Sequence, residues 1–231
     1  MNAVLHPPGL HSPVHHPGAD TLLRHAAGDL PSGHALVVAT HLPFCPICQA
    51  ATRLGEAVGG ALLAELPPTD MAPDALSRML SRLDTPAANV RSSVMRRRDE
   101  PVTLAAGVPL PASLLGLVRP AWRWIAPGVS RIVVAAPGAA AHERICLLRV
   151  APGSRLPDHG HSGWEAACVL SGSFNDVTGE YGPGDVAELD GEVLHEPVAG
   201  ADKPCICLIA WEGPLRMRGL FARIVQPLVG V

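Results

Sequence analysis

The chain is organised around the stretch His41-Leu42-Pro43-Phe44-Cys45-Pro46-Ile47-Cys48. This stretch places His41, Cys45 and Cys48 at the spacing H-x3-C-x2-C. Zn2+ prefers four nitrogen or sulfur ligands in a tetrahedron, and closely spaced Cys and His residues commonly supply them. A fourth ligand must come from elsewhere, and the pair His15 and His16 upstream offers two candidates. The stretch therefore predicts a small helical module held together by zinc.

Helical periodicity surrounds the stretch on both sides. Apolar residues recur at helical spacing over residues 19–30, and a shorter helix over 34–42 carries His41 in its last turn. Pro46 suits the first turn of a third helix, with Cys45 at its cap. The positive end of that helix's dipole favours thiolates at Cys45 and Cys48.

Two further amphipathic patterns complete a predicted all-α module of four helices. The third helix is expected to bury one apolar stripe, formed by Ile47, Ala51, Leu54, Val58 and Leu62. A fourth helix is expected from Asp74 to Leu83, with its leucines and Met79 on one side.

Composition limits the classes of function. The chain has 231 residues and a formal net charge of −3, which gives no electrostatic footprint for direct nucleic-acid binding. No apolar run is long and uninterrupted enough for a membrane span, and the N-terminus has no signal-peptide pattern. Without such a signal, the six cysteines predict reduced thiols and metal ligands. We therefore expect a cytoplasmic protein with no membrane partner.

Changes in pattern along the chain predict two domains. Residues 1–14 are rich in Pro and His and are expected to form a flexible tail. The helical zinc module is expected over 15–85, because Thr85-Pro86 ends the last helical pattern. Residues 86–107 contain a short basic run and are expected to be a linker. A second domain is expected over 108–231.

Short β-rich runs replace helical periodicity in this second domain. They lie between Gly and Pro turns at residues 131–135, 144–150, 165–170, 185–189 and 205–211. Several short strands at this spacing are typical of an all-β sandwich or barrel.

A second group of potential metal ligands lies in the β-rich region. His159 and His161 are two residues apart, so in a strand they face the same side, and Glu165 follows on the same or the next strand. His195 comes about thirty residues later, after a tight Gly182-Pro183-Gly184-Asp185 turn. Three imidazoles and a carboxylate suit Zn2+, Fe2+, Mn2+ or Ni2+, and the ligand set does not choose among them.

These residues resemble the cupin signature. Gly153-x5-His159-x-His161-x3-Glu165-x6-Gly172 matches the first cupin motif at every position. The second motif keeps Gly184 and His195, but Asp190 and Glu192 replace its Pro and Gly, and Ala199 replaces the trailing Asn. The resemblance implies a jelly-roll barrel that holds Zn2+ or another divalent transition metal.

The N-terminal pattern also resembles a known module. H-x24-H-x3-C-x2-C, formed by His16, His41, Cys45 and Cys48, is similar to the zinc anti-sigma domain. That domain followed by a cupin is the architecture of ChrR-type anti-sigma factors. The resemblance makes His16 the expected fourth ligand, with His15 as its competitor.

This resemblance implies a regulator and not an enzyme. The helical module would bind and inhibit an extracytoplasmic-function (group IV) sigma factor. The cupin would sense an oxidative stress such as singlet oxygen and thereby release the sigma factor. Cys205 and Cys207 share one face of a strand and form a candidate redox pair. The alternative is a cupin metalloenzyme, a dioxygenase or isomerase, with a helical zinc-binding appendage.

Overall fold

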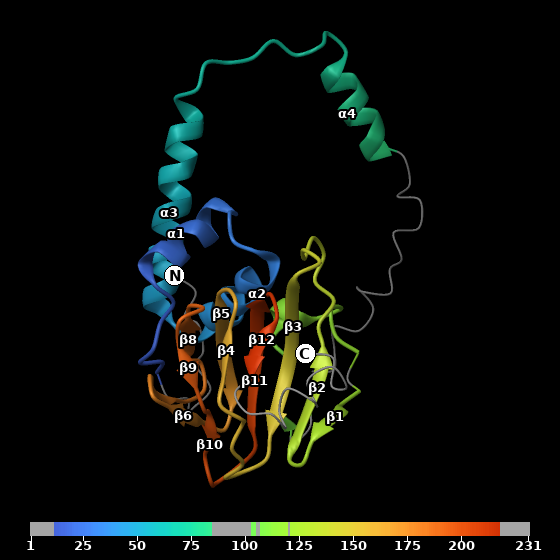
Figure 1. The fold of residues 1–231 in the computed structure, drawn as a ribbon. Coiled ribbons are helices and arrows are strands. Elements are labelled where there is room, and N and C mark those ends of the chain that lie inside the picture. The colour runs from blue at the N-terminus through green and yellow to red at the C-terminus, as the bar shows by residue number, and fades with distance from the viewer. Residues whose placement is uncertain (1–11, 85–102, 105–106, 120, 218–231) are drawn as a thin grey trace.

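The N-terminal part of the chain is helical. The computed structural model describes residues 12–84, 103–104, 107–119 and 121–217, so most of the predicted tail and of the predicted linker lies outside the described residues. Figure 1 shows most of the helices above the β-rich part, with one of them at the upper ends of the strands. They are α1 (Ala19–Ala27), α2 (Ser32–His41), the 3-10 turn η1 (Leu42–Phe44), α3 (Pro46–Ala64) and α4 (Ala75–Asp84).

The C-terminal part is built from strands after one short 3-10 turn, η3 (Ala112–Leu114). The strands are β1 (Arg123–Ala126), β2 (Val129–Val133), β3 (Glu143–Val150), β4 (His159–His161), β5 (Glu165–Ser171), β6 (Phe174–Asp176), β7 (Gly179–Tyr181), β8 (Val186–Leu189), β9 (Leu194–His195), β10 (Val198–Ala199), β11 (Cys205–Glu212) and β12 (Leu215–Met217). The predicted fold class, a helical module followed by an all-β domain, is confirmed.

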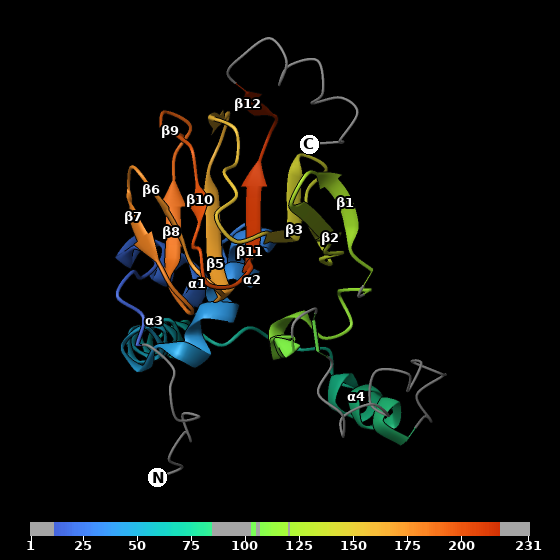
Figure 2. The same cartoon turned by 90° about the horizontal axis from the view of Figure 1, so that it is seen from below.

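The strands form one large sheet and two small ones. The large sheet has the order β1-β2-β3-β11-β5-β8, and the small sheets have the orders β10-β6-β7 and β12-β4-β9. Figure 2 shows β6, β7, β9 and β10 standing beside the large sheet. Apolar side chains of β6, β7 and β10 pack with one face of the large sheet, so this face is the inside of the sandwich.

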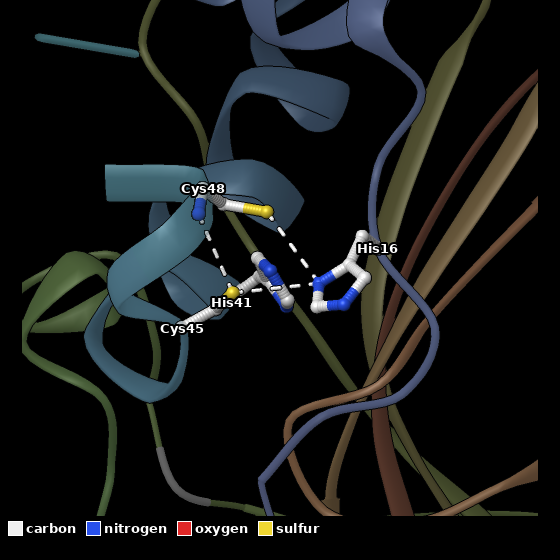
Figure 3. A group of neighbouring side chains, drawn as sticks. All are labelled: His16, His41, Cys45 and Cys48. Atoms are coloured by element: carbon white, nitrogen blue, oxygen red, sulfur yellow. Dashed lines mark hydrogen bonds between the residues drawn. The ribbon is translucent and has the colours of Figure 1, made fainter. Parts of the chain in front are cut away.

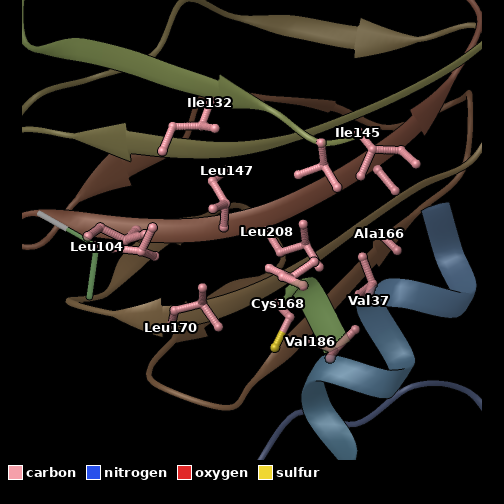
Figure 4. Close-up of a cluster of buried hydrophobic side chains, with 14 residues drawn as sticks. Val37, Leu104, Ile132, Ile145, Leu147, Ala166, Cys168, Leu170, Val186 and Leu208 are labelled. Atoms are coloured by element: carbon pink, nitrogen blue, oxygen red, sulfur yellow. The ribbon is translucent and has the colours of Figure 1, made fainter. Parts of the chain in front are cut away.

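Helix α2 covers the opposite face of the large sheet. Figure 4 shows Val37 of α2 pointing toward Ala166 and its neighbours on the strands. Val37 is fully buried in the same cluster as Leu147 and Leu208. Leu104, from the segment before the strands, also joins this cluster. The helical part and the β part therefore share one hydrophobic core.

The face of α3 that we predicted to be buried is exposed, and that prediction is wrong. Ile47, Leu54, Val58 and Leu62 are each more than half exposed, and Ala51 is also exposed. Figure 1 shows the reason, since α3 runs away from the barrel and α4 stands apart from it. Within the described ranges, no helix is long and apolar enough to span a membrane.

Candidate metal centres

The structure brings the N-terminal candidate ligands together. Potential ligand atoms of His16, His41, Cys45 and Cys48 all lie within 4.8 Å of one another. Figure 3 shows His16 facing the two cysteines, with its Nδ1 atom 3.4 Å from the sulfur of Cys45 and 3.5 Å from that of Cys48. The ring of His15 lies instead against Tyr181, with ring centroids 4.4 Å apart. The structure thus gathers His16, and not its neighbour, into the cluster.

Local backbone geometry explains how α3 presents its two thiols. Cys45 is extended, with φ −127° and ψ 100°, and caps the helix, while Pro46 occupies the first turn. The sulfur of Cys45 accepts a hydrogen bond from the backbone N–H of Cys48, at 3.4 Å. Both sulfurs consequently lie at the positive end of the helix dipole, as the sequence predicted.

His41 is oriented by the β domain. Its Nδ1 atom donates to the carbonyl oxygen of Gly184 at 2.6 Å, which leaves Nε2 as the atom with a lone pair. This Nε2 is buried and has no hydrogen-bond partner among the described residues. Burial also lowers the pKa of His41, which favours the neutral ring that a metal requires.

The Cys48 thiol is buried in an environment that opposes its charge, so the expectation that the helix dipole alone favours its thiolate is wrong. Burial, and then the neighbouring Cys45, raise the pKa of Cys48 to about 12. A bound divalent cation reverses this preference because it binds thiolates directly. An unpaired imidazole nitrogen beside two buried thiols and a second imidazole therefore fits a metal site. The cluster could hold a metal ion.

The strands bring the second set of candidate ligands together. Ligand atoms of His159 and His161 on β4, Glu165 on β5 and His195 on β9 lie within 4.8 Å of one another. The pairing of β4 with β9 sets His159 opposite His195, with their Nε2 atoms 3.2 Å apart. His161 contacts the carboxylate of Glu165, and both residues are buried. All four sequence-predicted residues of this group are therefore neighbours.

The outer hydrogen bonds of this group leave its inner atoms available. His159 Nδ1 donates to the carbonyl oxygen of Pro157 at 2.8 Å, and His195 Nδ1 donates to Asp176 at 2.8 Å. The Nε2 atoms of both rings thus face the centre of the group. Burial opposes ionisation of Glu165, but the adjacent His161 and the other two histidines lower its pKa on balance. An ionised carboxylate beside three imidazole rings fits a divalent metal.

Asp176 is a functional candidate that sequence reasoning did not identify, and the contact of Gly184 with His41 was also not expected. Burial opposes ionisation of Asp176, but hydrogen bonds from His195 and Thr178 outweigh it and hold its pKa at about 2. Asp176 lies outside both ligand motifs, Gly184 belongs to the second cupin motif only as a turn residue, and each contacts a ligand that is distant in the sequence. The turn before β8 was visible in the sequence, but its contact with His41 was not.

The candidate redox pair lies inside the sandwich. The sulfurs of Cys205 and Cys207 are 3.4 Å apart, and both side chains belong to the cluster between the sheets. The hydrogen bond to Cys205, together with burial, raises the pKa of Cys207. All six cysteines of the chain have free thiols in this structure.

Comparison with known proteins gives matches over both parts of the chain. Residues 117–215 match the family described as the ChrR Cupin-like domain. The chain is 36% identical to the Anti-sigma-E factor ChrR of Cereibacter sphaeroides over 213 residues, which is 92% of this chain and 96% of that protein. It is also similar to a chain in the crystal structure of Rhodobacter sphaeroides SigE in complex with the anti-sigma ChrR. There the TM-score is 0.67 and the identity 34%, over 86% of this chain and 98% of that one.

Proposed function

The chain belongs to the ChrR family of anti-sigma factors, and we propose that it binds and inhibits an extracytoplasmic-function (group IV) sigma factor. The solved relative is in complex with SigE, and the match extends over 98% of that relative's chain. Because a sigma factor works with core RNA polymerase, this proposal places the chain in the cytoplasm. The partner is a protein, and no direct contact with nucleic acid is required.

The exposed apolar face of α3 is the observation that carries the proposal. Ile47 is 74% exposed, Leu54 67%, Val58 52% and Leu62 61%, and they recur along one side of a 19-residue helix. Exposed apolar rows of this length are rare in monomers and usually mark protein–protein contacts. Helix α4 adds a second such face, formed by Leu76, Met79, Leu80 and Leu83. We assign these two faces, together, as the sigma-binding surface.

Zinc is the metal that the N-terminal donor set suits best. Two thiols and two imidazoles form a closed tetrahedral set, which is typical of structural zinc. His16 precedes α1, His41 ends α2, and both cysteines begin α3. An ion held by these four residues would join three chain segments at one point and so fix the direction in which α3 leaves the domain. The ion would act structurally and leave no open position for a substrate.

The cupin is proposed as the sensory domain. His159, His161, Glu165 and His195 would hold Zn2+ or another divalent transition metal, which supplies a Lewis-acidic centre in the sandwich. An oxidative signal such as singlet oxygen would act here and favour release of the sigma factor. The cupin fold alone does not exclude catalysis, but both close comparisons are with an anti-sigma factor. We therefore propose a regulator and not an enzyme.

Cys205 and Cys207 are proposed as a redox pair within this sensor. Their sulfurs lie 3.4 Å apart, which supports this role. Because residues two apart on an extended strand hold their Cβ atoms farther apart than a disulfide allows, β11 would bend as the bond forms. Oxidation by hydrogen peroxide would form the S–S bond and break the O–O bond, with the two thiol protons and both oxygens leaving as two water molecules. Burial and the raised pKa of Cys207 make its thiolate scarce in the closed barrel. The barrel must therefore open before the pair reacts.

Co-elution tests the proposed function. The full chain and a group IV sigma factor encoded in the same genome are mixed and separated by size-exclusion chromatography. We expect one complex with the wild-type chain and separate peaks with Leu54→Glu combined with Leu62→Glu. Trp124→Glu changes an equally exposed apolar residue on β1 and is expected to keep the complex. Separate peaks for the wild-type pair, or loss of the complex with Trp124→Glu alone, would contradict the assignment.

A further inference from the structure

Residues 176–186 contact ligands of both candidate metal centres. The segment runs from the end of β6 through β7 and the following turn to the first residue of β8. We infer that it couples the two centres mechanically, so that a metal ion on the cupin ligands slows the loss of metal from the N-terminal ligands. The inference rests on the proposed occupation of both sites, but it does not depend on the sigma factor.

The cupin end of the segment is a chain of hydrogen bonds that begins at a candidate ligand. His195 Nδ1 donates to Asp176 Oδ2 at 2.8 Å. Asp176 Oδ1 accepts from the backbone N–H of Thr178 at 2.8 Å and from its hydroxyl at 2.5 Å. The same hydroxyl oxygen is 2.9 Å from the hydroxyl of Tyr181. Each of these hydrogen bonds restricts the position of the next residue. The orientation of the His195 ring therefore influences the position of Tyr181 on β7.

Tyr181 carries this contact to the N-terminal module. Its ring lies 4.4 Å from the ring of His15, at an angle of 39°. It also stacks against Phe174, with centroids 4.8 Å apart. Gly179 makes room for His15, since a Cβ atom there would lie 3.3 Å from Cε1 of its ring. In Figure 2 the blue segment before α1 passes beside β7, where this contact is made.

The turn after β7 holds the backbone of His15 from both sides. Asp185, which is 1% exposed, accepts with Oδ1 from the N–H groups of Val14 at 2.7 Å and His15 at 2.9 Å. The N–H of Val186 donates to the carbonyl oxygen of His15 at 3.1 Å. The next residue is His16, so these bonds to residues 176–186 also set the backbone position of this candidate ligand.

The same turn orients the second imidazole of the module. Gly184, with φ +90°, gives its carbonyl oxygen to Nδ1 of His41 at 2.6 Å. A Cβ atom at Gly184 would lie only 2.9 Å from Cβ of Phe44, so the close approach requires glycine. Both histidines of the N-terminal cluster therefore take their position from residues 176–186.

Metal at the cupin ligands is expected to strengthen metal binding at the N-terminal ligands, because the contacts of residues 176–186 orient imidazole rings at both sites. Partners that hydrogen-bond a metal-binding imidazole determine its orientation, and their loss typically weakens metal binding about 10- to 100-fold. A metal ion on His195 holds that ring and thereby Asp176 and Thr178, whereas a ring without metal can turn away from Asp176. By linkage the coupling is reciprocal, so metal in the N-terminal cluster should also tighten binding at the cupin.

Release of Co2+ from the N-terminal cluster tests the inference. The full chain is loaded with Co2+, and an excess of chelator is added. Thiolate-to-cobalt charge-transfer absorption reports the Cys45–Cys48 site alone, since the cupin ligands include no sulfur. His159→Ala removes a cupin ligand that lies outside the segment. Thr178→Val changes an exposed residue and removes the hydroxyl that links Asp176 to Tyr181 by hydrogen bonds.

We expect each variant to release cobalt about fivefold faster than wild type, or more, which corresponds to ordinary coupling between sites. The double variant should be no faster than either single variant, because both changes break one path. Ser113→Ala removes a different contact between α2 and the β domain, the 2.8 Å bond to Thr40, and should release at the wild-type rate. A wild-type rate in His159→Ala, multiplicative effects in the double variant, or equal acceleration by Ser113→Ala would each overturn the inference. None of these rates involves a sigma factor, so the proposed function stands or falls separately.

Discussion

Helices α2 and α3 are consecutive and both carry N-terminal candidate ligands, but their surroundings are opposite. Six of the ten residues of α2 are buried, because the helix lies against the large sheet. Only Cys48 and Thr52 are buried among the 19 residues of α3. One helix is thus part of the β domain's core, and the other is held at its first turn and by its contact with α1.

This difference shows that the helical module contains one helix that anchors it to the sheet and one helix that leaves an apolar face exposed. Helix α2 anchors the module through Val37 and through His34, which stacks on Trp164 at 3.9 Å. Helix α3 leaves its apolar face available and depends on the metal cluster and on α1 for its position. A signal that reaches the cluster could therefore move α3 without unfolding the β domain.

Metal removal should give the largest effect and should act on α3 far more than on α2. Structural zinc contributes on the order of 10 kcal/mol to small zinc-binding peptides. We expect the backbone amides of α3 to lose nearly all protection from hydrogen exchange when Cys48→Ser empties the cluster. Amides of α2 should keep most of theirs, because the sheet still covers them. Hydrogen exchange followed by mass spectrometry measures both in one sample, and equal loss in the two helices would contradict the division.

A charge placed on α2 should destabilise the fold, whereas a charge placed on the exposed face of α3 should not. Val37→Asp buries an unpaired carboxylate in the core shared by α2 and the sheet, and should cost about 3 kcal/mol or more. Leu54→Asp lies on the exposed face of α3 and should change the free energy of unfolding by less than about 0.5 kcal/mol. Urea denaturation of both variants gives the two values. A large loss with Leu54→Asp would mean that the described chain itself covers this face in solution.

The sequence predicted helices and ligands well because both follow from short-range spacing. H-x3-C-x2-C on adjoining turns and H-x-H on one strand bring ligands together wherever the elements form. The apolar row of α3 was also predicted, but its burial was not. Periodicity shows that a face favours an apolar neighbour, and it does not show whether that neighbour belongs to the same chain.

The residues that orient the ligands could not be predicted in the same way. Asp176 reaches His195 across 19 positions, and Gly184 reaches His41 across 143. The first contact depends on how β6 lies beside β9 and the second on how the turn before β8 meets the end of α2, and no local pattern encodes either arrangement. The five strands expected from β-rich runs were found, whereas short strands such as β9 and β10 carry too few residues for a pattern.

The anchoring of α2 should weaken in acid through His34. Burial lowers the pKa of His34 from 6.5 to about 4, so the folded chain keeps this ring neutral. The unfolded chain takes up a proton below pH 6.5, and stability present above that pH is lost as the pH falls toward 4. The loss should reach about 2 kcal/mol by pH 5. Urea midpoints for the wild type and for His34→Phe, which keeps a ring beside Trp164, isolate this contribution. Parallel pH profiles in the two proteins would contradict it.

The smallest expected effect comes from the polar contact of α2 with the segment before the sheet. Ser113→Ala removes the partner of Thr40, whose hydroxyl is fully buried, and an unsatisfied buried hydroxyl costs about 1–2 kcal/mol. Arg53→Ala removes an exposed bond to Gln49 on α3 and should cost no more than about 0.5 kcal/mol. Thermal unfolding of the two variants compares one polar contact on each helix. If Ser113→Ala is as neutral as Arg53→Ala, the anchoring of α2 rests on its apolar face alone, and the contrast between the helices is one of hydrophobic burial only.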